Sequence, residues 1–368
     1  MGIINEGKFG VQEAVCLATI SMSTKIFFTS PAFLTNYVGN AGWQMTLIST
    51  LTSIIAFSFI YILLKRFPGK DIIQIFDISL GRIIGFIFSF AFAAAFLEAA
   101  AMLLREFVDV IKVYVYRETP PDILIWTVVF AAVLSSFLGL ETLARISKLT
   151  AYIMLVTYFI LLLFAIPQYN PTNLFPFFGY GIDKTLIHGI RRSSAYEEVT
   201  ILAVFAGSLQ GTGYIKKAGF ISLILSGFIL TLGLLSFSMA YPYETTQELI
   251  APIYVLARGI KYGTFFQRLD PIFLFLWIFA SHIAISIVFY CAVSCYSKIF
   301  RLSDLRPVIG PMAILLYTLA MLPRDFASVI EGNVHNIREY GWAIFYVLPL
   351  ISLIIAAIRK KKGDTQNA

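Results

Sequence analysis

The sequence predicts an all-α integral membrane protein whose ten transmembrane helices form two inverted five-helix repeats. Three observations support this fold class. Residues 10–359 contain about ten apolar segments, each close to the ~20 residues that cross a bilayer. Only 13% of the 368 residues are charged, against ~25% in an average soluble domain. The polar connections are short, so we expect one membrane domain over residues 1–368 rather than two soluble domains.

Each repeat should contain five spans, because an odd number forces the second repeat into the opposite orientation. We expect the first repeat at 10–166, the second at 184–358 and a basic cytoplasmic tail at 359–368. The predicted spans, in chain order, are 10–31, 42–64, 80–104, 122–139, 146–166, 184–212, 216–241, 269–297, 307–322 and 340–358.

The spans of the first repeat carry two informative patterns. The run Ser21-Met-Ser-Thr-Lys25 interrupts the first span with polar residues, which predicts a discontinuous helix. Trp43 begins the second span as an interfacial anchor. Gly81 and Gly85, at the start of the third span, have the spacing of small residues that permits close helix packing.

The second repeat follows an outer loop, because the prolines in 167–183 exclude a continuous helix. Its first span contains the polar run 191–198, which no lipid-facing helix could carry. Glu197 and Glu198 are neighbours and would point about 100° apart on a regular helix, so only a break lets both face one cavity. The alternative is a helix that starts at Val199 after a solvated loop. Residues 199–207 are too few to cross a bilayer, which favours the broken helix.

Two other ionisable residues lie inside predicted spans. Glu98 stands among apolar residues of the third span, where an unpaired carboxylate would be protonated or would need a cation. Lys25 lies at a comparable depth, which predicts a Lys25–Glu98 pair; alternatively, either side chain reaches the outer interface. His282, in the eighth span, is a candidate ligand or proton relay, or a packed residue that donates to a nearby carbonyl.

The charge distribution predicts orientation and excludes some function classes. Connections on the side of both termini hold more lysine and arginine, which places the termini in the cytoplasm. The net charge of +7 then reflects topology and contact with anionic lipid, and nucleic-acid binding is not expected. Common enzyme motifs and metal-binding His or Cys spacings are absent, so we expect neither a catalytic site nor a metal or cofactor.

A series of motifs follows in order along nearly the whole chain. They are Ala41-Gly-Trp43, Phe67-Pro68, Leu80-Gly81, Tyr196-Glu-Glu198, Lys216-Lys217, Ala251-Pro-Ile-Tyr-Val-Leu-Ala-Arg258, Gln267-Arg-Leu-Asp-Pro-Ile-Phe-Leu-Phe-Leu-Trp277 and the basic tail. In their order and spacing the chain resembles the B subunits of spore germinant receptors, the GerAB-type spore permeases of the amino acid–polyamine–cation transporter superfamily.

This resemblance implies a protein of the spore inner membrane, in a complex with a larger A subunit and a lipoprotein C subunit. It implies recognition of a small nutrient, usually an amino acid, that triggers germination. We therefore expect a pocket in the middle of the membrane between the broken helices. Its expected lining is Ser21, Ser23, Thr24, Glu98, Tyr196, Glu197 and Glu198.

Two alternative functions remain at this point. One is a proton-coupled amino acid transporter in which Glu98 or Glu198 releases and takes up the proton. The other is an ion or water conduit, or a scaffold without ligand binding, with Lys25, Glu98 and Arg191 along a hydrated path.

Overall fold

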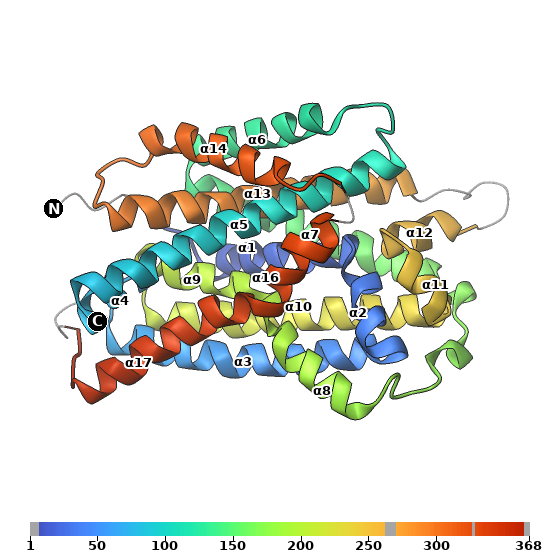
Figure 1. Cartoon of the computed structure of the whole chain (residues 1–368), viewed down its shortest axis with the longest axis horizontal. Helices are drawn as coiled ribbons and strands as arrows, with labels where there is room; N and C mark the ends of the chain where they lie inside the picture. Colours follow the sequence, from blue (N-terminus) through green and yellow to red (C-terminus); the bar gives the residue numbers. More distant parts are fainter. Residues whose placement is uncertain (1–6, 262–269, 326–327, 364–368) are drawn as a thin grey trace.

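The computed structural model describes residues 7–261, 270–325 and 328–363, and these residues fold into a helical bundle. The long helices run side by side along the longest axis, and α4 lies at the opposite end of the bundle from α11 and α12 (Figure 1). Residues 267–269 of the motif at 267–277 lie outside the described residues. So do residues 364–368 of the predicted tail at 359–368.

The first predicted repeat corresponds to seven α-helices and two 3-10 turns. They are α1 (Val11–Ser23), η1 (Thr24–Phe27), α2 (Ser30–Val38), η2 (Gly39–Ala41), α3 (Gly42–Arg66), α4 (Ile72–Leu80), α5 (Arg82–Tyr114), α6 (Pro121–Leu138) and α7 (Leu140–Phe164).

The second predicted repeat has its irregular segments at its two ends. Its elements are α8 (Ile182–Arg191), η5 (Arg192–Thr200), α9 (Ile201–Val204), α10 (Thr212–Ala240), α11 (Tyr243–Glu248), α12 (Pro252–Gly259), α13 (Asp270–Ile299), α14 (Arg306–Met321), the π-helical η7 (Val329–Val334), α16 (His335–Trp342), the π-helical η8 (Ala343–Val347) and α17 (Leu348–Ile358).

The predicted membrane architecture is confirmed. Within the described residues, seven helical stretches are long and apolar enough to cross a membrane. The predicted first and sixth spans are both interrupted, by η1 and by η5. The exact count of ten crossings and the division into repeats at 10–166 and 184–358 stay predictions.

One predicted boundary is wrong in a way that affects the site. The third span was expected to end at residue 104, but α5 continues to Tyr114. At 33 residues, α5 is about 50 Å long, whereas the hydrocarbon core is ~30 Å thick. Its last turns pack inside the protein, and they carry Arg105, Glu106 and Asp109 as buried residues.

The core lies where α1, α5, α7, α10 and α13 pack against one another. α1 is buried on nearly all sides after its first turn, as expected for a helix at the centre of a membrane bundle. α6, α7 and α14 instead present large apolar side chains outward, where lipid would cover them. The two interruptions therefore sit in the interior rather than at the lipid-facing surface.

Candidate functional site

The predicted first span, called helix 1 from here on, breaks after α1, in a segment that leaves backbone donors in need of partners. Phe28 is extended, and the chain restarts as α2 with Pro31 in its first turn, where the missing N–H costs no hydrogen bond. The Glu106 carboxylate accepts hydrogen bonds from the Thr29 amide (3.0 Å) and from the Thr29 hydroxyl. The carboxylate thus caps α2, at the helix end that favours negative charge.

The predicted sixth span, called helix 6 from here on and distinct from α6, breaks at η5, a nine-residue 3-10 segment between α8 and α9. Serines of the neighbouring α3 supply donors to the last turn of α8 and to η5. Ser49 donates to the carbonyl of Gly189 (2.8 Å), and Ser53 donates to the carbonyl of Ser193 (3.1 Å). This satisfies backbone groups that water cannot reach inside a membrane protein.

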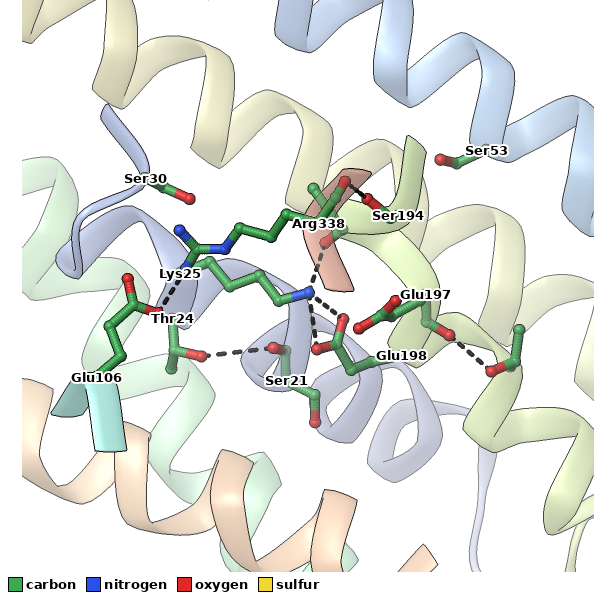
Figure 2. Close-up of polar contacts among 12 residues, drawn as sticks. Ser21, Thr24, Lys25, Ser30, Ser53, Glu106, Ser194, Glu197, Glu198 and Arg338 are labelled. Atoms are coloured by element: carbon green, nitrogen blue, oxygen red, sulfur yellow. Dashed lines mark hydrogen bonds and ion pairs between the residues drawn. The ribbon is translucent and has the colours of Figure 1, made fainter. Parts of the chain in front are cut away.

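An ion pair joins the two breaks. Lys25 Nζ, from η1, lies 2.8 Å from both carboxylate oxygens of Glu198, from η5 (Figure 2). The same ammonium donates to the carbonyl of Ala195 at 3.1 Å. Lys25 is 2% exposed and Glu198 is 1% exposed. Each charge therefore depends on the other for its burial.

A second buried ion pair lies beside the first. Arg338 of α16 reaches Glu106 of α5 with an N–O distance of 2.5 Å and donates to the Thr29 hydroxyl at 3.3 Å. Ser194 of η5 donates to the backbone carbonyl of Arg338. Figure 2 shows the two pairs side by side, so η1, η5, α5 and α16 meet at one polar centre.

Two further charged side chains at this centre have unpartnered polar atoms. Arg192 is buried, donates to Ser30 (3.2 Å) and lies 4.7 Å from the ring centroid of Phe33. Among the described residues, its Nε and Nη1 have no hydrogen-bond partner, and neither does Oε2 of buried Glu197. Buried charged groups are costly without a partner, so these atoms are the ones best suited to bind a polar ligand.

Most of the predicted site residues lie at or next to the breaks. Thr24 donates to the carbonyl of Ser21 (3.4 Å), and Ser21 donates to Leu17 one turn earlier. Ser23 is buried with an unpartnered hydroxyl among the described residues. Tyr196 is buried and its hydroxyl is hydrogen-bonded to the Thr50 hydroxyl at 2.8 Å.

Glu98 and His282 are placed differently from these residues. Glu98 is half-buried on α5, about 12 Å along the helix from Glu106, because eight residues separate them. His282 bonds through Nδ1 to the carbonyl of Ile278 (2.9 Å) and contacts the ring of Phe107. This geometry fits a packed histidine within α13.

The predicted Lys25–Glu98 pair is wrong, because Lys25 pairs with Glu198. The prediction rested on similar depth along the two helices, and depth does not tell which face of the bundle a side chain reaches. Glu106 and Arg338 were missed because both were assigned to outer connections. The apolar spacing of Leu103, Phe107, Val110 and Ile111 would have indicated that the buried helix continues.

Comparison with known proteins shows the family and the fold of the chain. The sequence profile of the spore germination protein family, the spore permeases, matches residues 14–328. Spore germination protein KB of Bacillus subtilis (strain 168) is 24% identical over 333 residues, which cover 89% of each chain. Spore germination protein YndE of the same organism is 24% identical over 335 residues, covering 87% of this chain and 88% of YndE.

Two solved transporters share the fold at 12% identity. A substrate-bound Na⁺-coupled sialic acid symporter aligns with a TM-score of 0.66, over 99% of this chain and 93% of the symporter. Mhp1, a nucleobase-cation-symport-1 family transporter with bound bromovinylhydantoin, aligns with a TM-score of 0.63, over 98% of this chain and 94% of Mhp1. The chain is thus an integral membrane protein with a transporter-like fold, and it belongs to the spore permease family of spore germination proteins.

Proposed function

We propose that this chain is the nutrient-recognition subunit of a spore germinant receptor and that it binds a small molecule between the breaks of helices 1 and 6. The observation that carries this proposal is the buried polar centre, with unpartnered atoms on Arg192 and Glu197. Family membership supports a role in germination. The fold supports binding in the bundle interior, because discontinuous helices form the binding sites of such transporters.

An amino acid fits the charges of this centre. The planar guanidinium of Arg192 presents adjacent donors that suit a ligand carboxylate. Glu197 offers a carboxylate oxygen to a ligand ammonium. Ser21, Ser23 and Thr24 in helix 1, and Tyr196 and Glu198 in helix 6, would complete the lining.

The ligand would act by favouring one arrangement of the bundle, to the extent that it binds that arrangement more tightly. The A subunit and the lipoprotein C subunit would detect that arrangement in the spore inner membrane. We place both chain termini in the cytoplasm, on the charge bias of the connections.

Lys25 adds a specific expectation about ion coupling. In transporters of this type, unwound carbonyls and nearby acidic groups coordinate the coupling cation. Here the Lys25 ammonium already lies against the carbonyl of Ala195 and the carboxylate of Glu198. We therefore expect ligand binding to be independent of Na⁺, with equal affinity in sodium and in choline buffers.

Glu197→Gln tests the proposal most directly, because it removes the negative charge without changing the size of the side chain. We expect spores with this variant to lose the germination response at an unchanged protein level. The control is Glu141→Gln: the Glu141 side chain is 41% exposed in the first turn of α7, and spores with this variant should germinate normally. A normal dose–response from Glu197→Gln would contradict the assignment.

Uptake of labelled amino acid into proteoliposomes that hold this chain alone distinguishes a transporter from a sensor. Ligand binding without flux supports the sensor. Sustained accumulation driven by a pH gradient supports the transporter, and Glu98 or Glu198 would then be the proton site to mutate first. A thermal-shift screen of amino acids, sugars and nucleosides against the purified receptor tests the third function, since no compound should stabilise a scaffold or conduit.

A further inference from the structure

A groove lies at the end of the bundle opposite α11 and α12, away from the polar centre. Its volume is about 520 Å³, within the range of ligand sites. It is formed by α4, the first turns of α5 and the end of α13. The lining residues are Ile73, Asp77, Arg82, Ile83, Phe86, Ile87, Ser89, Ile299, Phe300 and Arg301.

One wall of the groove is apolar and faces outward. Ile83 is 78% exposed and Ile87 is 56% exposed, and both belong to a helix that is long and apolar enough to cross the membrane. Phe86 and Phe300, which also line the groove, are exposed as well. Such side chains on a membrane-spanning helix contact acyl chains, so the groove opens toward lipid rather than toward another part of the protein.

The polar end of the groove is positively charged. Arg82 has no ion pair or hydrogen bond within the described part of the chain, whereas Arg301 lies 3.7 Å from Asp77. Two cations therefore face one carboxylate. α5 begins here after Gly81, which has no side chain to cap the first amides, so the start of the helix also favours an anion.

Two details indicate a shaped site rather than a shallow surface. Ser89 is 1% exposed, lines the groove, and its hydroxyl has no hydrogen-bond partner among the described residues. Gly85 lets α4 approach α5 closely, since a Cβ there would lie 2.8 Å from the Asp77 Cα and the Phe76 carbonyl oxygen. The close packing at Gly85 brings Asp77 of α4 next to the first turns of α5, where both helices line the groove.

We propose that the groove binds an anionic phospholipid. Its phosphate would lie between Arg82 and Arg301 at the start of α5, its glycerol region would reach Ser89, and its acyl chains would follow Ile83 and Ile87. Charge complementarity selects an anionic lipid, because basic pockets between transmembrane helices bind such headgroups.

The test measures thermal unfolding of the full chain in detergent with added phosphatidylglycerol, phosphatidylcholine or inorganic phosphate. Of the three additives, only phosphatidylglycerol should raise the melting temperature. Arg82→Gln should weaken the apparent affinity about fivefold, and the Arg82→Gln, Arg301→Gln double variant should lose most of the shift. Arg145→Gln is the matched control, because Arg145 is an exposed arginine outside the groove, at the start of α7, and it should keep the full shift.

Three results would overturn the proposal. They are an equal shift with phosphatidylcholine, the same shift with inorganic phosphate alone, and an equal loss in the Arg145→Gln control. Mass spectrometry of lipid that co-purifies with the chain gives an independent measurement, and phosphatidylglycerol should be depleted in Arg82→Gln relative to the wild type.

Discussion

Removal of the Lys25 charge tests whether the two helix breaks are held together by an ion pair. Lys25→Met keeps the length and apolar stem of the side chain but leaves Glu198 as a buried carboxylate without its cation. Loss of one partner of a buried pair costs ~3–5 kcal/mol. Because domains are stable by only about 5–15 kcal/mol, we expect a large fall in the free energy of unfolding. Combination with Glu198→Gln should restore much of the loss, since no charge is then stranded.

The assay is a double-mutant cycle on the full chain in detergent, with the folded fraction followed by thermal unfolding. The exposed Glu141–Arg145 pair of α7 provides the control cycle. Substitution of either residue should lower the free energy of unfolding by no more than ~1 kcal/mol. A free energy of unfolding for Lys25→Met within ~1 kcal/mol of the wild-type value would refute the role of this ion pair. A double variant no more stable than the worse single variant would refute it too, because the two charges would then not depend on each other.

Three other substitutions test the neighbouring contacts. Arg338→Met strands Glu106 and should lower the free energy of unfolding by ~3–5 kcal/mol, with partial recovery when Glu106→Gln is added. Gly341→Ala places a Cβ 2.5 Å from Oε2 of Glu197, so it should shift the germination dose–response more than it reduces the amount of folded protein. Tyr196→Phe removes one buried hydrogen bond and should cost about 1 kcal/mol in thermal unfolding; a loss above about 3 kcal/mol would show that the hydroxyl has another role.

Hydropathy predicted the fold class because a bilayer requires long apolar helices whatever else the protein does. The polar runs at 21–25 and 191–198 predicted the interruptions for the same reason, since neither run could face lipid. These are local properties of the chain: η1 begins inside the first run, at Thr24, and η5 begins inside the second, at Arg192. The sequence also predicted that Lys25 needs a carboxylate.

The choice of partner could not be predicted, because it depends on how the helices are rotated about their axes. Lys25 pairs with Glu198, which lies 173 residues later in the chain, and Glu106 pairs with Arg338, 232 residues later. A charged cluster at the end of an apolar segment can belong to a solvated loop or to a buried continuation of the helix. Residues 105–109 belong to the buried part of α5, and only the packing around α5 distinguishes this from a loop.

The bonds between α3 and helix 6 have a mechanical consequence. Near its middle, α3 bonds to the last turn of α8 through Ser49 and to η5 through Ser53. At its last turn, Arg66 donates to the carbonyls of Ala356 (3.0 Å) and Lys361 (2.6 Å), where α17 passes into the C-terminal tail. α3 is one continuous helix of 25 residues, and such a helix curves only gently, so its two ends move together. A displacement of the helix 6 break is therefore linked through α3 to the base of the C-terminal tail, at the far end of the molecule.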